Sequence, residues 1–176
     1  RALLRNWTLV YLANLAGAVG TVLLVCGSGH LSLGEHMVGA QALKIAAAKV
    51  NLPFAEAFFR GVLCNVLVCL AVWLCYAAHD VAGKILAIVF PISAFVALGF
   101  EHSVANMYFI PIGILAAADP AIVQASGLSG AALAGLDGSG FLRNLLPVTL
   151  GNIVGGGVLV AAVYYLIYLR GRPARR

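Results

Sequence analysis

Long apolar stretches separated by short polar segments dominate this chain. Four of them reach or exceed the roughly 20 apolar residues that a helix needs to cross about 30 Å of hydrocarbon. They run over residues 6–26, 57–77, 85–117 and 145–169. The pattern predicts an all-α membrane protein in which residues 1–176 form a single transmembrane domain with four spans.

The third stretch is too long for one straight crossing and contains several residues that interrupt helices. These are Pro91, Gly99, Pro111 and Gly113. Glu101, His102 and Asn106 crowd into its middle, where ionisable groups are costly and usually face a cavity or a partner. Non-helical backbone at that depth must be buried in protein or line water. We therefore predict a helix broken near residues 99–103; its polar cluster is either functional or a structural kink with satisfied partners.

An internal repeat links the first and last spans. The segment "RNWTLVYLANLAGAV" from Arg5 matches "RNLLPVTLGNIVGGG" from Arg143 at a constant offset of 138 positions. In a four-span topology these two spans cross in opposite directions, which indicates an inverted repeat. We expect the chain to be the C-terminal part of a six-span protein, with a second broken helix in the part that precedes it.

Small residues at four-residue spacing lie inside the repeated segments. Such pairs allow helices to approach closely in lipid, and an intervening asparagine can bond across helices. The sequence predicts this helix-packing role for Ala13, Asn14 and Gly17 in the first span and Gly151, Asn152 and Gly155 in the fourth.

Composition and charge agree with a membrane location. Mean hydropathy is +1.01, and only 10% of residues are charged. Arg1, Arg5, Lys84 and the tail at 170–176 fall on one side, which the positive-inside rule makes cytoplasmic, so the C-terminus is expected there. The net charge of +5 thus reflects topology. Dispersed or terminal basic residues make nucleic-acid binding improbable.

The expected outer side holds two segments. Residues 33–49, with "ALKIAAAK", favour a short helix at the membrane interface. The loop at 119–142 is rich in Gly, Ala and Ser and is expected to be flexible. Its "SGLSGAALAGLDGSG" lacks the Lys-Ser/Thr ending of a phosphate-binding loop.

Three motifs resemble the formate/nitrite transporter family over nearly the whole chain. They are "GFEHSVANMYFIPIGI", "RGVLCNVLVCLAVW" and "PVTLGNIVGGG". The resemblance implies an aquaporin-like fold of six helices, the second and fifth broken, with this chain supplying the third to sixth. It also implies a homopentamer with one pore per protomer in the inner (cytoplasmic) membrane of a prokaryote.

The same resemblance implies roles for single residues. His102 corresponds to a central pore histidine, Phe95 and Val68 to residues that narrow the pore, and Asn106 to a residue that stabilises the break or contacts the ion. A supporting polar group behind the pore wall comprises Glu101, Lys49 and Asn65. The lysine charge would draw anions into the outer vestibule. The family's threonine partner of the histidine belongs to the second helix, which this chain does not contain.

A transport mechanism follows from elementary electrostatics. A small anion pays a large desolvation cost in a narrow apolar channel, and protonation removes that cost. Histidine, with an ordinary pKa of about 6.5, can change charge near neutral pH. We expect proton-linked passage of a weak-acid anion, formate before nitrite or hydrosulfide, with no cofactor; a rigid anion channel is the rival within the transport class.

A membrane-embedded metalloenzyme is the alternative from another class, and a purely structural anchor is a third. The cysteines, Cys26, Cys64, Cys69 and Cys75, form no CxxC pair and are expected to be packing residues. His30, Glu35 and His36 could in principle gather a metal, but chance proximity is favoured and no metal site is predicted.

Overall fold

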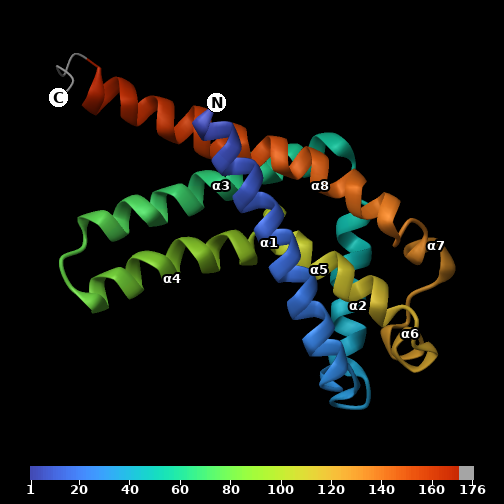
Figure 1. Ribbon diagram of the computed structural model, residues 1–176. Helices are drawn as coiled ribbons and strands as arrows, with labels where there is room; N and C mark the ends of the chain where they lie inside the picture. Colours follow the sequence, from blue (N-terminus) through green and yellow to red (C-terminus); the bar gives the residue numbers. More distant parts are fainter. Residues whose placement is uncertain (171–176) are drawn as a thin grey trace. The chain divides into compact units, whose positions relative to one another are not determined.

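The computed structural model describes residues 1–170, and within that range the chain is helical, with no strand (Figure 1). The helices group into two compact units. The first contains residues 1–54 and 103–146, and the second contains residues 55–102 and the chain from Pro147 onward. Each unit is described by itself.

The first unit is built on three helices, α1 (Ala2–Gly27), α2 (Met37–Val50) and α5 (Ser103–Ala116). The short helix η1 (His30–Ser32) connects α1 to α2, and α5 packs against both longer helices. The core of the unit contains Val22, Leu31, Leu43, Ile112, Ala116 and Ile122. Most of α1 lies outside this core, with a long row of exposed apolar side chains, as expected for a helix in lipid.

Helix α2 occupies most of residues 33–49, where a short interfacial helix was expected, and it packs against other helices. One of its faces is buried against α5 and α6. Small residues make this possible, because Gly113 of α5 faces Ala46 so closely that an added Cβ would collide with it. The apolar face that suggested a membrane surface therefore packs against protein. The buried residues of α2 are Gly39, Ala40, Leu43, Ala46, Ala47 and Val50.

The glycine-rich segment at 119–142 is ordered rather than flexible. It forms α6 (Pro120–Ser126) and α7 (Gly130–Leu133), and Ile122 of α6 enters the core. The Asp119 carboxylate accepts a hydrogen bond from the Ala121 N–H at 2.9 Å and so caps α6. Asn51 donates to the Ala132 carbonyl at 3.0 Å, which ties the segment to the end of α2.

The second unit contains α3 (Phe54–Ala77) and α4 (Val81–Ala97). It also contains the end of α8 (Gly138–Ile153), which continues in wider π-helical turns as η2 (Val154–Ala162) and η3 (Tyr165–Leu169). Gly151 and Gly155 press against α3, since an added Cβ would collide with the carbonyl oxygens of Phe58 and Val62 respectively. This is the close approach expected of the small residues in the fourth span.

Three described helices are long and apolar enough to cross a membrane: α1, α3 and the continuous helix Gly138–Leu169. A fourth crossing is possible if α5 and α6, bent by 110° at their junction, count as one span. The predicted third span corresponds to α4 and α5, which residues 98–102 separate. The interrupting prolines, Pro91 and Pro111, remain inside helices, so the break lies at the glycine and not at either proline.

Candidate functional site at the helix break

Helix α4 ends in a Schellman motif that starts the break. Gly99 adopts the left-handed conformation with φ of 66°, which only glycine adopts without a steric penalty. The Gly99 N–H donates to the Val96 carbonyl at 3.1 Å, and the Phe100 N–H donates to the Phe95 carbonyl at 3.0 Å. These are the two bonds that close a Schellman C-terminus. The sequence "ALGFEH" therefore stops α4 before the polar cluster begins.

The backbone of Glu101 is held from both sides. Its N–H donates to the carbonyl of Arg60 at 3.3 Å, and its carbonyl accepts from the Asn152 side chain at 3.0 Å. Asn152 also donates to the Gly61 carbonyl at 2.8 Å, and Asn65 donates to the Asn152 carbonyl at 2.6 Å. Glu101 is only 3% exposed. The break is therefore fixed to α3 and to the last long helix through backbone carbonyls.

His102 directly follows this anchored residue and is half-buried. Its imidazole lies near the ring of Phe95, with centroids 6.0 Å apart and an interplanar angle of 28°. Phe95 comes from the last turn of α4, so the Schellman turn brings the two rings onto the same side of the break. Val68 is also half-buried, on α3. A titratable imidazole beside an aromatic surface could hold or move a proton where water is scarce.

The first unit holds the other two residues of the predicted site, Lys49 and Asn106. The Lys49 ammonium lies 5.7 Å from the centroid of the Phe109 ring, within cation–π range. Asn106 is fully buried and donates to the Asn144 side-chain oxygen at 2.7 Å. Asn144 in turn donates to the Lys49 carbonyl at 2.8 Å. Asn106 thus belongs to a chain of side-chain amide hydrogen bonds that fixes the backbone at Lys49.

Asn144 was not singled out from the sequence, although it is 2% exposed and joins two predicted residues. A signal was available, because the repeat pairs Asn6 with Asn144 at the offset of 138. Only one member of that pair is buried, since Asn6 is exposed. The repeat alone could not distinguish them.

The first span departs from the packing expected of it. The Asn14 amide donates to the Val10 carbonyl within its own helix at 2.8 Å, not across helices. An added Cβ at Gly17 would meet nothing within 4 Å. In contrast, the matching residues of the fourth span, Asn152 and Gly155, make close interhelical contacts. Within the described residues, the two copies of the motif therefore have different surroundings.

The comparisons with known proteins agree with the motifs. The family profile described as formate/nitrite transporter matches residues 1–166. The chain belongs to the formate/nitrite transporter family. It is 43% identical over 171 residues to the formate channel FocA of Escherichia coli strain K12, covering 96% of this chain and 60% of that protein. It is 45% identical over 182 residues to a probable formate transporter of Methanothermobacter thermautotrophicus, with the same coverage. The chain thus spans about 60% of the length of these relatives.

Solved structures extend the likeness to the fold. A pentameric formate channel with formate bound superposes with a TM-score of 0.87 at 39% identity, covering 97% of this chain and 68% of that one. A second structure, an FNT family ion channel, gives 0.69 at 35% identity, covering 89% and 56%. The prediction of an all-α, multi-pass membrane fold in this family is confirmed.

Membership of a transporter family sets the metalloenzyme alternative aside. Among residues 1–170, no three His, Cys, Asp or Glu side chains gather in a way that could hold a metal ion. His36 instead lies near Asp119, with Nδ1 3.9 Å from the carboxylate oxygen. The four cysteines form no disulfide within residues 1–170, and Cys64 is buried.

The predicted site residues fall into two groups. Glu101, His102 and Asn65 lie in the second unit with Phe95 and Val68, whereas Lys49 and Asn106 lie in the first. The structure joins Asn65 to the break through Asn152. The grouping of Lys49 with Glu101 and Asn65 stays a prediction.

Proposed function

We propose that this chain forms part of a transmembrane pore for small monovalent weak-acid anions, with formate as the principal substrate. Two observations support the substrate class. Relatives at 43% identity are named formate channels, and the superposed pentameric channel contains bound formate. One feature of the chain carries the proposal, namely the half-buried imidazole of His102 at an anchored helix break. Nitrite and hydrosulfide are the alternative substrates.

The local chemistry favours passage of the neutral acid. Low dielectric disfavours a charged carboxylate, so an anion that enters an apolar constriction becomes more basic. The Phe95 ring provides an apolar surface beside the imidazole, and Val68 is proposed to line the same narrow passage. A proton delivered at His102, from the imidazole or from water that it orients, would discharge the anion there. The acid then releases this proton on the far side of the constriction, so that the anion and the proton cross together, and a proton from the entry side restores His102.

Lys49 is proposed to raise the local concentration of anions before they reach the constriction. Lys49 is half-buried with its ammonium over the Phe109 ring, and the buried Asn106–Asn144 pair fixes its backbone. A positive charge at a partly dehydrated wall attracts small anions more strongly than one in open water. We further propose assembly as a homopentamer, as in the superposed formate channel, with a cytoplasmic C-terminus in an inner membrane.

The test is uptake of radiolabelled formate into liposomes that contain the full-length protein, measured across pH. His102→Phe should abolish the pH-dependent part of uptake, because it keeps an aromatic ring of similar size but removes both ring nitrogens. His79→Phe is the matched control, since His79 is exposed in the turn between α3 and α4 and should change little. An unchanged rate and pH profile in His102→Phe would overturn the role given to His102.

The rival reading, a rigid anion channel, predicts a different electrical result. Passage of the neutral acid carries no net charge, so imposed membrane potential should have little effect on formate flux at a fixed pH gradient. A rigid anion channel would show flux that follows the potential. Competition by nitrite, hydrosulfide, acetate and lactate in the same vesicles ranks the substrates, and a strong preference for hydrosulfide would displace formate.

A further inference from the structure

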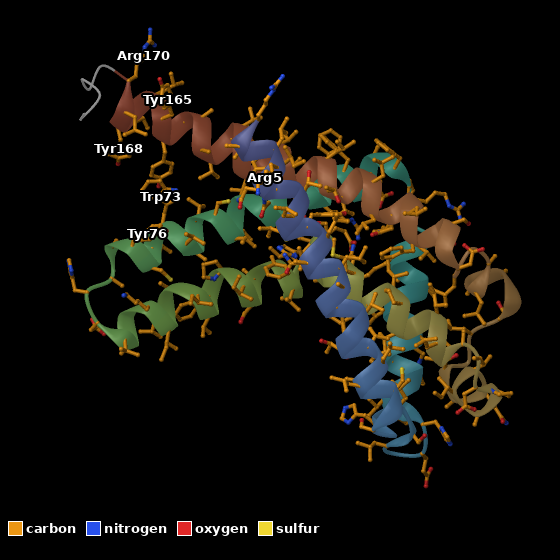
Figure 2. All side chains as sticks on the ribbon, viewed as in Figure 1. Arg5, Trp73, Tyr76, Tyr165, Tyr168 and Arg170 are labelled. Atoms are coloured by element: carbon orange, nitrogen blue, oxygen red, sulfur yellow. The ribbon has the colours of Figure 1, made fainter. Side chains whose placement is uncertain are left out.

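Five aromatic side chains gather where α3 and the last long helix end. Figure 2 shows four of them, Trp73 and Tyr76 from α3 and Tyr165 and Tyr168 from η3, with Arg170 beyond. Tyr164 lies between the two helices in the same unit, stacked on Trp73 with centroids 4.0 Å apart and an interplanar angle of 14°. Tyr164 also stacks on Tyr168 at 5.5 Å. Trp and Tyr at the end of a span are typical of the membrane–water interface, where one edge of the ring is apolar and the other is wet.

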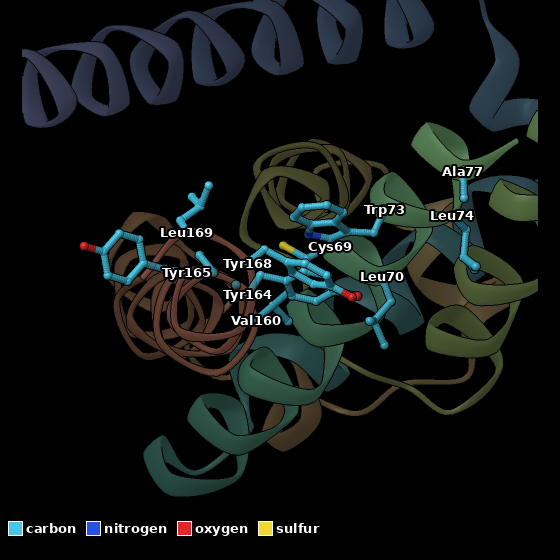
Figure 3. Close-up of a pocket in the computed structure, with 12 residues that line it drawn as sticks. Cys69, Leu70, Trp73, Leu74, Ala77, Val160, Tyr164, Tyr165, Tyr168 and Leu169 are labelled. Atoms are coloured by element: carbon cyan, nitrogen blue, oxygen red, sulfur yellow. The ribbon is translucent and has the colours of Figure 1, made fainter. Parts of the chain in front are cut away.

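Four of these rings, those of Trp73, Tyr164, Tyr165 and Tyr168, border a cavity of about 710 Å³. The cavity lies within the range of roughly 300–1,000 Å³ that small-molecule sites occupy. Figure 3 shows Cys69 and Trp73 on the α3 side and Tyr164 and Tyr168 on the side of the last helix. The rest of its wall is mainly aliphatic and includes Leu70, Leu74, Val160 and Leu169. An elongated apolar group would fit this wall better than water, which needs two to four polar partners.

A positively charged residue follows directly after this wall in the chain. Arg170 directly follows Leu169, which lines the cavity, and its side chain is exposed. The sequence places four arginines in its last seven residues and no acidic residue after Asp137. Basic residues next to the end of a span bind anionic lipid headgroups, and each contributes about fivefold in affinity near a membrane surface.

We propose that this cavity is a binding site for an anionic phospholipid. One acyl chain lies along Leu70, Leu74 and Val160, and the phosphate is held near Arg170 by charge and by the tyrosine hydroxyls of the aromatic cluster. Two features favour lipid over another helix. The cluster is open at the surface of its unit, with Tyr168 52% exposed and Trp73 41% exposed, and the positive charge of Arg170 beside it matches an anionic headgroup. This site is separate from the helix break and does not depend on the transport proposal.

The experiment uses phospholipids with brominated acyl chains, which quench tryptophan fluorescence at short range. The full-length protein is reconstituted in vesicles of brominated phosphatidylglycerol or brominated phosphatidylcholine at equal mole fraction. The signal of Trp73 is the part of the fluorescence that Trp73→Phe removes. We expect Trp73 to be quenched by both lipids, with about fivefold higher apparent affinity for the anionic one.

Two variants separate the cavity from general surface charge. Arg170→Gln should reduce the preference for the anionic lipid severalfold and leave quenching by phosphatidylcholine in place. Lys84→Gln removes an exposed positive charge that is expected on the same side of the membrane and should keep the preference. The proposal is overturned if Trp73 is not quenched by either lipid, because protein then covers the cavity. It is equally overturned if Lys84→Gln and Arg170→Gln have the same effect.

Discussion

Asn152 offers a direct test of how the break is held. Its side-chain amide donates to the carbonyls of Gly61 and Glu101, at 2.8 and 3.0 Å, and it is 7% exposed. Asn152→Ala removes both bonds. Interhelical hydrogen bonds of this kind in membranes contribute on average about 0.6 kcal/mol and at most about 1.7 kcal/mol each. The Glu101 carbonyl lies outside both helices and also loses a buried partner, which adds about 1 kcal/mol or more. We expect a loss of roughly 2–4 kcal/mol in the free energy of unfolding.

The assay is reversible unfolding of the full-length protein in mixed micelles with increasing sodium dodecyl sulfate, followed by circular dichroism. Asn65→Ala provides a graded comparison, because the Asn65 side chain donates one interhelical hydrogen bond, to the Asn152 carbonyl at 2.6 Å, where Asn152 donates two. It should cost about half as much. Asn152→Asp keeps the volume but replaces two donors with acceptors, so it should be at least as damaging as alanine. A cost below about 0.5 kcal/mol for Asn152→Ala, or a milder effect of aspartate, would refute this account of the break.

Three further predictions concern the rest of the chain. Asp137 caps α8, and the hydrogen bond that it accepts from the Ser139 hydroxyl is the main cause that lowers its pKa below 3.8. Asp137→Ala should therefore lower the melting temperature by roughly 2–4 °C at neutral pH. This difference from the unchanged protein should vanish as pH falls through the lowered pKa, which melting curves at several pH values would show. Gly151→Ala should cost about 1–3 kcal/mol because the new methyl group collides with the Phe58 carbonyl, whereas Gly138→Ala, with nothing within 4 Å, should cost less than about 0.5 kcal/mol in the same unfolding assay. Lys49→Gln should reduce formate uptake severalfold at low ionic strength and flatten its dependence on salt, and an unchanged salt profile would remove Lys49 from the entry path.

The sequence predicted the break well because it combines a glycine with an acidic residue in an apolar segment. Gly99 ends α4, and Glu101 follows it in a segment too apolar to leave a carboxylate in lipid. Prolines were poorer markers. Pro91 and Pro111 stay inside helices, since a membrane helix can tolerate a missing N–H where neighbouring groups satisfy the freed carbonyl.

Other features depend on tertiary contacts that composition does not encode. The face of α2 that looked suited to a membrane surface is covered by α5 because Gly113 admits Ala46 at very short range. Likewise, Asn14 and Asn152 occupy the same place in the repeat, yet only Asn152 has interhelical partners among the described residues. A pattern of small and polar residues indicates that a helix can pack closely, but not which helix it meets.

The way Glu101 is anchored also matters for protein engineering. Both of its described backbone bonds use the main-chain N–H and carbonyl, so neither depends on the carboxylate. These two backbone bonds thus remain available when the side chain at this position is changed. A saturation library at residue 101 would vary the side chain while these two backbone bonds stay available, whereas a library at residue 152 would remove the amide that holds the Glu101 carbonyl.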